Sequence, residues 1–147
     1  MKNLIILLTL LLSINSLASV NELNELLKNI KGVDQKFVDL GNCQLRYELE
    51  QDVQTRPLIQ RDVTALINLN EIDARTVKSE RNAVVFFTKD FVDSIKVNVL
   101  SYNHLNDELI QYEYEAAGFK IQVTNDNARQ KRFIQALFKK VLLNCQQ

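Results

Sequence analysis

The chain has 147 residues, with 18 basic and 18 acidic side chains and a formal net charge of zero. A neutral chain has no long-range attraction for nucleic acid or anionic lipid, so we expect neither as a partner. Only three glycines and one proline are present, which argues against a disordered tail or a linker between two domains.

The first eighteen residues have the pattern of a secretory signal peptide. Lys2 precedes an apolar run from Leu4 to Leu12. Ser16 and Ala18 then place small residues at the −3 and −1 positions of a cleavage site. The run is too short for a lasting membrane anchor, and no cysteine follows for lipid attachment. We therefore expect a periplasmic or secreted protein; the alternative is a retained N-terminal anchor.

Residues 19–147 are expected to form a single α+β domain, which is long enough to bury its own core. Apolar residues recur at helical spacing between residues 20 and 31, with Asn21 as N-cap and Gly32 after the last turn. This pattern predicts a short N-terminal helix. Residues 33–40 are transitional between that helix and the first strand; the alternative is that they belong to the following strand.

From residue 42 the apolar period changes from 3.6 to 2, which is typical of half-buried strands. The seven expected strands cover approximately residues 42–50, 63–69, 75–80, 83–88, 94–99, 109–115 and 119–123. Residues 83–88 are apolar on both faces and should form a central strand. Residues 116–118 are interpreted as the short connection of a hairpin.

The end of the chain, residues 125–147, predicts an amphipathic helix. Its apolar stripe consists of Ile134, Leu137, Phe138, Val141 and Cys145, and Leu143 lies on the opposite side. Such a stripe requires an apolar partner surface, which the preceding strands provide. We therefore expect this helix to close the fold.

The chain has only two cysteines, Cys43 and Cys145. Export permits oxidation, and the first strand and last helix would present both side chains to the core, so we expect a disulfide between them. Closing that loop would add up to about 4–5 kcal/mol. The alternatives are two free buried thiols or a bridge between two chains.

This order of elements, with one cysteine in the first long strand and another at the end of the last helix, resembles pleckstrin-homology-like split barrels and small secreted bacterial domains of that layout. The resemblance covers about Asp39 to Cys145. It implies an antiparallel seven-stranded split barrel or sandwich closed by the C-terminal helix. The alternative is a cystatin-like sheet that cradles the N-terminal helix. Phosphoinositide binding is not expected, because the loop after the first strand contains arginines balanced by acids and no lysine.

No combination of residues predicts catalysis, a cofactor or a metal site. His104, the sole histidine, follows Asn103 in a polar turn and should be solvated. Glu48 and Glu50 share an exposed strand face, where cross-strand ion pairs are expected; the alternative is a carboxylate pair that hydrolyses a glycosidic bond. The basic side chains expected on the solvated face of the last helix are Arg129, Lys131, Arg132, Lys139 and Lys140.

By exclusion, the sequence predicts an exported, non-enzymatic binding or structural domain of the bacterial cell envelope. We expect a monomer whose partner is an envelope protein or peptide. Tyr112, Tyr114 and Phe119 are the candidate residues of a binding groove between strands and helix. The alternatives are a carrier of a small apolar ligand and a hydrolase of an envelope polymer that acts through Glu48 or Glu50.

Overall fold

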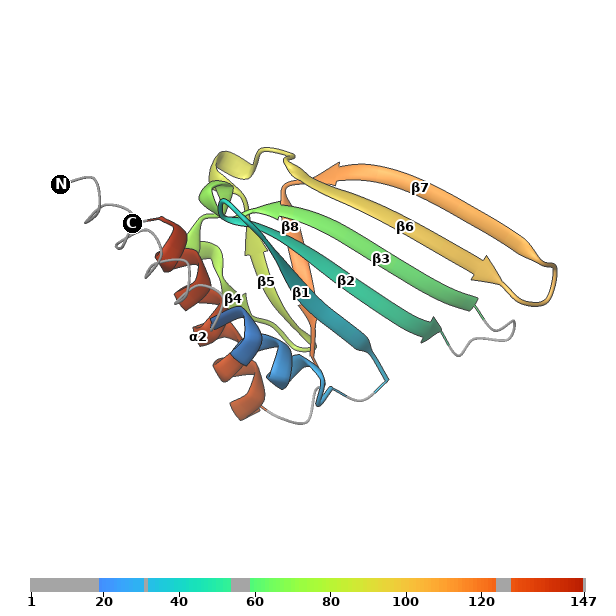
Figure 1. The fold of residues 1–147 in the computed structure, drawn as a ribbon, viewed down its shortest axis with the longest axis horizontal. Helices are drawn as coiled ribbons and strands as arrows, with labels where there is room; N and C mark the ends of the chain where they lie inside the picture. Colours follow the sequence, from blue (N-terminus) through green and yellow to red (C-terminus); the bar gives the residue numbers. More distant parts are fainter. Residues whose placement is uncertain (1–18, 31, 54–58, 124–127, 147) are drawn as a thin grey trace.

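The computed structural model describes residues 19–30, 32–53, 59–123 and 128–146. These residues form an α+β fold with two helices and two antiparallel sheets (Figure 1). The predicted signal peptide, residues 1–18, lies outside them. Neither described helix has the length and apolar character that crossing a membrane would require.

The strands are numbered in the order in which they follow one another along the chain. An N-terminal helix covers residues 19–27. The strands are β1 (Asp34–Gly41), β2 (Gln44–Val53), β3 (Ile59–Asn68), β4 (Lys78–Ser79), β5 (Ala83–Phe87), β6 (Ile95–Asn103), β7 (Glu108–Ala116) and β8 (Gly118–Gln122). Three 3-10 turns, η1 (Leu69–Glu71), η2 (Ala74–Thr76) and η3 (Lys89–Phe91), connect them, and α2 (Ala128–Cys145) closes the chain.

The described strands divide into a five-stranded sheet, in the order β1-β2-β3-β6-β7, and a three-stranded sheet, in the order β4-β5-β8. The two sheets do not close into a barrel, and eight strands are present instead of the expected seven. The predicted seven-stranded, pleckstrin-homology-like layout is therefore not confirmed. The additional strand is β1, whose buried positions are Gln35 and Phe37. A polar residue at one of them hid the alternation that identifies a strand.

The register of the five-stranded sheet explains which of its faces forms the core. Phe37, Tyr47, Ala65 and Val97 lie opposite one another on four neighbouring strands, and all four are buried. Side chains on alternate positions turn to the opposite face of a sheet. The sheet thus has an inner face that packs on the second sheet and an outer face that carries charges such as Lys36 and Glu48.

The prediction that residues 83–88 form a central strand is confirmed. β5 lies between β4 and β8, and its first four residues are buried. The predicted hairpin at residues 116–118 is wrong, because β7 pairs with β6 whereas β8 pairs with β5. The chain changes sheets at this point: the carbonyl of Ala117 accepts a hydrogen bond from the amide of Thr88, and Gly118 packs closely on Phe87.

The C-terminal helix packs on the sheets through the predicted stripe. Ile134, Phe138 and Val141 are fully buried. Leu142 is also fully buried, although the pattern did not single it out, and Leu143 is exposed as expected. The N-terminal helix lies beside α2 (Figure 1), and the Gln130 side chain donates a hydrogen bond to the carbonyl of Leu26 at 3.1 Å.

The two cysteines come together as predicted, with their Cα atoms 5.6 Å apart in a disulfide. Cys43, however, does not lie in a strand. It occupies the turn between β1 and β2, where Asn42 and Cys43 both have positive φ angles. The disulfide therefore joins the first hairpin turn to the last residue of α2.

Candidate interaction surface

β7 is the most exposed long strand among the described residues. Every residue of β7 from Glu108 to Glu115 is exposed, and only Ala116, at the end of the strand, is partly buried. β7 forms the edge of the five-stranded sheet and lies away from the helices (Figure 1). Most strands in globular proteins bury at least one face. A nine-residue strand that is exposed on both faces is therefore unusual.

One face of β7 continues the apolar inner face of the sheet. Tyr112 lies opposite the buried Val99, and Tyr114 lies opposite the buried Val97. Ile110, Tyr112 and Tyr114 nevertheless retain 49%, 47% and 48% of their accessible surface. The two tyrosine rings stack with their centroids 6.2 Å apart. We refer to Ile110, Tyr112 and Tyr114 as the tyrosine face.

The opposite face of β7 is acidic. Glu113 lies opposite Asn98 and accepts a hydrogen bond from its side-chain amide at 3.1 Å. Glu115 lies opposite Lys96. We refer to Glu113 and Glu115 as the acidic face. It borders a shallow hollow of about 630 Å³ on the outer side of the sheet, which Arg46 and Leu66 also line.

The structure does not bring the three predicted groove residues together. Tyr112 and Tyr114 share the exposed face of β7, whereas Phe119 packs in the interior. Its ring centroid lies 5.0 Å from that of Tyr47 and 5.8 Å from that of Phe86. The tyrosines thus belong to a surface, and Phe119 belongs to the contact between the two sheets.

His104 lies in the turn at the tip of the hairpin and is exposed, as predicted. Its ring packs edge-on against that of Tyr102, with centroids 4.7 Å apart. The Tyr102 hydroxyl donates a hydrogen bond to Asp107, which raises the pKa of Tyr102. These contacts stabilise the turn that joins β6 to β7.

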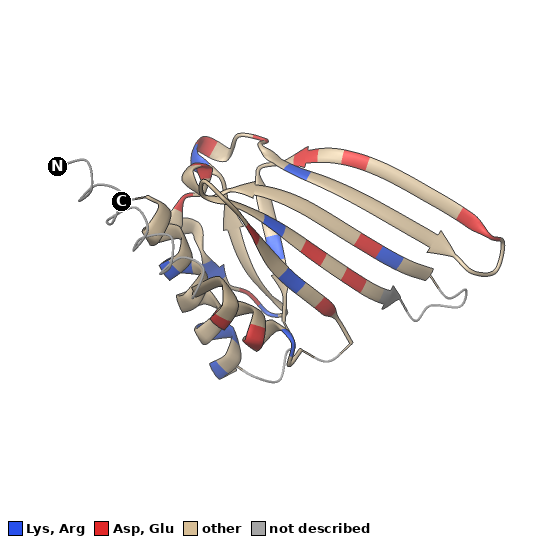
Figure 2. Ribbon diagram, viewed as in Figure 1, with Lys and Arg blue, Asp and Glu red and all other residues tan. Residues whose placement is uncertain are grey.

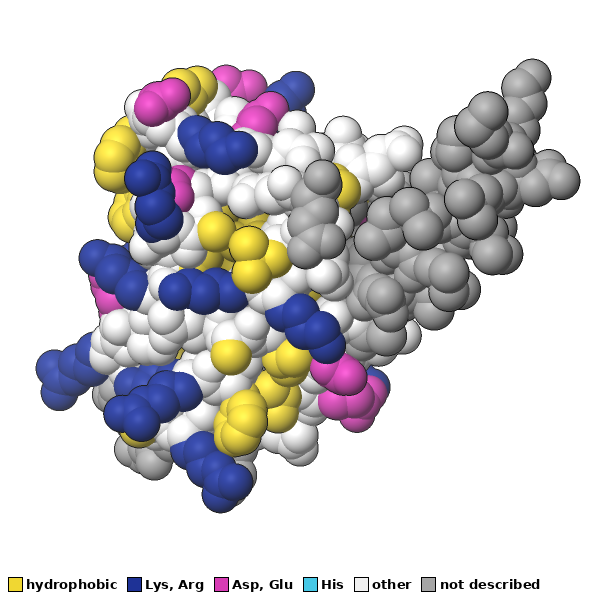
Figure 3. Space-filling view, turned by 90° about the vertical axis from the view of Figure 1, so that its left-hand side faces the viewer, with side chains coloured by type: hydrophobic (Ala, Val, Ile, Leu, Met, Phe, Trp, Pro, Cys, Tyr) yellow, Lys and Arg dark blue, Asp and Glu magenta, His cyan; other side chains and the backbone are white. Residues whose placement is uncertain are grey.

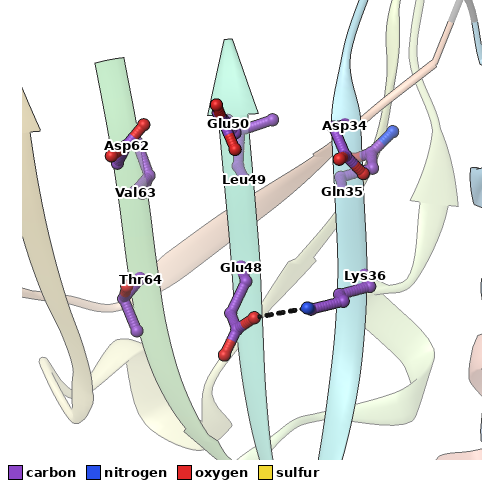
Figure 4. Close-up of a pocket in the computed structure, with 9 residues that line it drawn as sticks. All are labelled: Asp34, Gln35, Lys36, Glu48, Leu49, Glu50, Asp62, Val63 and Thr64. Carbon is purple, nitrogen blue, oxygen red and sulfur yellow. Dashed lines mark ion pairs between the residues drawn. The ribbon is translucent and has the colours of Figure 1, made fainter. Parts of the chain in front are cut away.

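Glu48 forms a cross-strand ion pair, as its position predicts. Its carboxylate lies 3.1 Å from Lys36 Nζ on β1 (Figure 4). It also lies 2.7 Å from Arg46 Nε on its own strand. The hydrogen bond from Lys36, together with the one from Arg46, lowers the pKa of Glu48. A general acid needs a raised pKa, so this environment suits an ionised ion-pair partner.

Asp34, Glu50 and Asp62 follow Glu48 as a second row across the same three strands (Figure 4). Glu50 accepts a hydrogen bond from the Gln60 side chain at 3.3 Å. Across the described residues, no three Asp, Glu, His or Cys side chains are arranged to hold a metal ion. This row is therefore a charged outer face.

A second exposed apolar feature lies at the end of η3, where Phe91 and the following residue, Val92, are exposed. The Phe91 ring packs on that of Phe87 with centroids 5.5 Å apart. Beside it, Arg75 binds the carboxylate of Asp73 through its guanidinium, which lowers the pKa of Asp73 to about 2. This feature is a short turn, much smaller than the surface of β7.

Charge is distributed unevenly between the two ends of the molecule (Figure 2). β7 contains three glutamates and no basic residue, whereas α2 contains five basic residues and no acid. Lys and Arg side chains are spread over the end that carries α2 (Figure 3). Some have internal contacts, since Lys131 donates to the carbonyl of Arg81 at 2.9 Å and Lys140 lies 3.9 Å from Glu22. The β7 end is thus the acidic end.

The fold and this surface define a small α+β domain with two sheets and an open sheet edge. No protein-family model, curated protein or solved structure matches the chain. The function is therefore inferred from the residues of the chain itself.

Proposed function

We propose that this chain is an exported, non-enzymatic binding domain of the bacterial cell envelope, and that it binds a protein or peptide partner through β7. The observation that carries the proposal is the tyrosine face. It continues the buried apolar row of the sheet onto a strand that nothing in the described residues covers. Exposed apolar side chains that are contiguous with a core mark interaction sites in stable domains.

The interior favours binding at the surface over carriage of an apolar ligand inside the fold. Phe138 contacts Phe86 with ring centroids 4.5 Å apart and Phe37 at 5.8 Å. Tyr47 packs on Phe37 at 5.1 Å. These rings occupy the space between the two sheets where a ligand would have to lie.

The disulfide supports the exported location. A disulfide persists in an oxidising compartment such as the periplasm or the cell exterior. The pairing of Cys43 with Cys145 is compatible with such a compartment. Fractionation of cells that express the full chain tests this part of the proposal, which requires the protein outside the cytoplasm with residues 1–18 removed.

The binding proposal is tested by photo-crosslinking in the producing cells. A photoreactive phenylalanine analogue at Tyr112 should form a discrete crosslinked product with an envelope protein. The same analogue at Leu143, which is 53% exposed on α2, is the matched control and should not form that product. No product at position 112, or the same product from both positions, would contradict the proposal.

A further inference from the structure

We propose that β7 binds its partner by strand addition: an extended segment of another polypeptide pairs with the free edge of β7 as a sixth strand of the sheet. That segment has apolar side chains on one face and Lys or Arg on the other. This inference rests on the proposed binding function and specifies the chemistry of the partner.

The first observation is the length of the open edge. β7 pairs with β6 over all nine of its residues without a register shift, and no other described strand pairs with it. In an antiparallel strand, alternate residues direct their N–H and C=O groups away from the paired neighbour. β7 contains no proline, lysine or glycine. It therefore lacks the proline, lysine and bulge that often prevent another strand from pairing with an edge, and its only charged side chains are glutamates, which a basic segment can pair with.

The other edges of the two sheets differ from β7. β1 has a register shift between Asp39 and Gly41, and both backbone groups of Phe37 are bonded by one side chain. Asn24 of the N-terminal helix accepts from the Phe37 amide at 2.7 Å and donates to the Phe37 carbonyl at 2.8 Å. The N-terminal helix thus occupies the edge of β1 at Phe37.

The edges of the three-stranded sheet are short. β4 has two residues, and α2 covers the segment around it: Gln135 donates to the carbonyl of Val77 at 3.0 Å and accepts from the Ser79 hydroxyl. β8 has five residues, and its Gln122 carbonyl accepts a bond from the Gln35 side chain at 2.7 Å. Only β7, among the described edges, is both long and unoccupied.

The side chains of β7 specify which strand fits. Cross-strand neighbours lie on the same face of a sheet and interact in pairs. An added strand would place apolar or aromatic side chains beside the tyrosine face. On the other side of the sheet, it would place Lys or Arg beside the acidic face. The partner segment is therefore extended, with basic and apolar residues in alternation.

A second copy of this chain fits the edge less well. Antiparallel pairing of β7 with its own copy places identical faces on the same side of the sheet. In full register, Glu113 would lie opposite Gln111 of the copy and Glu115 opposite Leu109, so neither acid would gain a basic neighbour. A basic segment therefore fits the edge better than a second copy does, and we expect the free protein to be a monomer.

The first test uses a blocked ten-residue peptide in which lysine alternates with valine, and measures its dissociation constant by fluorescence anisotropy. The variant Glu113→Lys/Glu115→Lys should weaken binding by about tenfold or more. The control Glu22→Lys/Glu25→Lys makes the same change in net charge on the N-terminal helix and should bind as the wild type does. Equal losses in the two variants, or no binding to the wild type at millimolar peptide, would overturn the proposal.

The second test distinguishes strand addition from docking of side chains alone. Two N-methylated peptides of the same sequence are compared, one methylated at every second residue and the other at the intervening residues. In strand addition, the peptide uses the N–H groups along only one of its two edges to bond to β7. One methylated peptide should therefore lose binding, and the other should retain it. Equal binding of both would overturn strand addition, as would a stable dimer of the free chain formed through β7.

The two proposals can fail separately. If crosslinking at Tyr112 succeeds but both methylated peptides bind equally, the domain binds through β7 and strand addition is wrong. If the crosslink is absent but only one of the methylated peptides binds, β7 accepts an added strand. The proposal that its partner is a protein of the cell envelope is then wrong.

Discussion

Phe138 of α2 stacks on Phe86 of β5, with ring centroids 4.5 Å apart and ring planes inclined by 27°. Both side chains are fully buried, and Phe138 also packs against Phe37 of β1. Phe86 belongs to the three-stranded sheet and Phe37 to the five-stranded sheet. Phe138 of α2 therefore contacts both sheets, which explains why this helix closes the fold.

Replacing Phe138 with alanine should lower the free energy of unfolding by about 3–5 kcal/mol, because the change removes buried area and leaves a cavity. Leu143→Ala is the matched control, since Leu143 is exposed on the same helix, and it should cost less than about 0.5 kcal/mol. Denaturant titration of both variants measures the difference. Equal losses would show that α2 does not pack through this stripe.

Reduction of the disulfide between Cys43 and Cys145 should lower stability by about 2–5 kcal/mol, because it releases the constraint on a long loop of the unfolded chain. After reduction, the last turn of α2 should become more mobile than the rest of the fold. Denaturant titration with and without reductant measures the loss. The variant Cys43→Ser/Cys145→Ser should not respond to reductant, and a wild-type protein equally insensitive would contradict this prediction.

Tyr47 links the two sheets through a buried hydrogen-bond chain. Its hydroxyl donates to the Gln35 side chain at 2.5 Å, and Gln35 donates to the Gln122 carbonyl at 2.7 Å. Tyr47→Phe leaves the Gln35 oxygen without its donor, which should cost about 1–3 kcal/mol. Urea titration near neutral pH measures this loss, and an unchanged stability would contradict the role of the chain.

Burial raises the pKa of Tyr47 above its ordinary value of 10.0. Above about pH 10 the unfolded chain loses a proton that the folded chain retains, so stability should fall as pH rises. Stability measured against alkaline pH should show this slope in the wild type and a smaller slope in Tyr47→Phe. Equal slopes in the wild type and in Tyr47→Phe would contradict this prediction.

Gly118 permits the chain to pass between the sheets. A Cβ atom at this position would lie 2.5 Å from Cδ1 of Phe87. Gly118→Ala should therefore destabilise the fold by about 1–3 kcal/mol, as the Phe87 ring must move. In a Phe87→Ala background the same change should cost little. Thermal or urea unfolding of the wild type, the two single variants and the double variant measures this coupling. The prediction is contradicted if Gly118→Ala lowers the free energy of unfolding equally with and without the Phe87 side chain.

The sequence predicts elements well where the signal is local. The stripe of α2 is visible because Ile134, Phe138 and Val141 recur at helical spacing, and the structure confirms that all three are buried. The central strand β5 is visible because both of its faces are apolar. Two cysteines admit one intramolecular pairing, and the structure brings them together.

What the sequence misses depends on long-range contacts. β1 was not recognised because its buried Gln35 is polar, and Gln35 is satisfied by Tyr47 and Gln122, which are distant in sequence. The alternation predicts that Cys43 lies in a strand, whereas residues 42–43 form a turn with positive φ angles. The change of sheet after Ala116 was missed because Ala-Ala-Gly is equally suited to a hairpin turn.

The candidate site was predicted in part. The strand predicted at residues 109–115 is present as β7, and Tyr112 and Tyr114 share one of its faces. The alternation cannot show whether another layer covers that face, because coverage depends on which strands form the second sheet. Phe119 follows β7 closely in sequence but packs with Tyr47 and Phe86 in the interior. The open edge is thus a property of the fold and not of the local pattern.

The open edge of β7 is tested most directly by amide hydrogen exchange of the free protein, resolved residue by residue by NMR. Every second amide between Glu108 and Ala116 points away from β6 and has no partner among the described strands. These amides should exchange rapidly. The Phe37 amide, bonded to Asn24 on the edge of β1, should be protected. Addition of the alternating Lys–Val peptide should then protect the rapidly exchanging β7 amides. Uniform protection of β7 without peptide, or no change upon its addition, would contradict an edge that accepts a sixth strand.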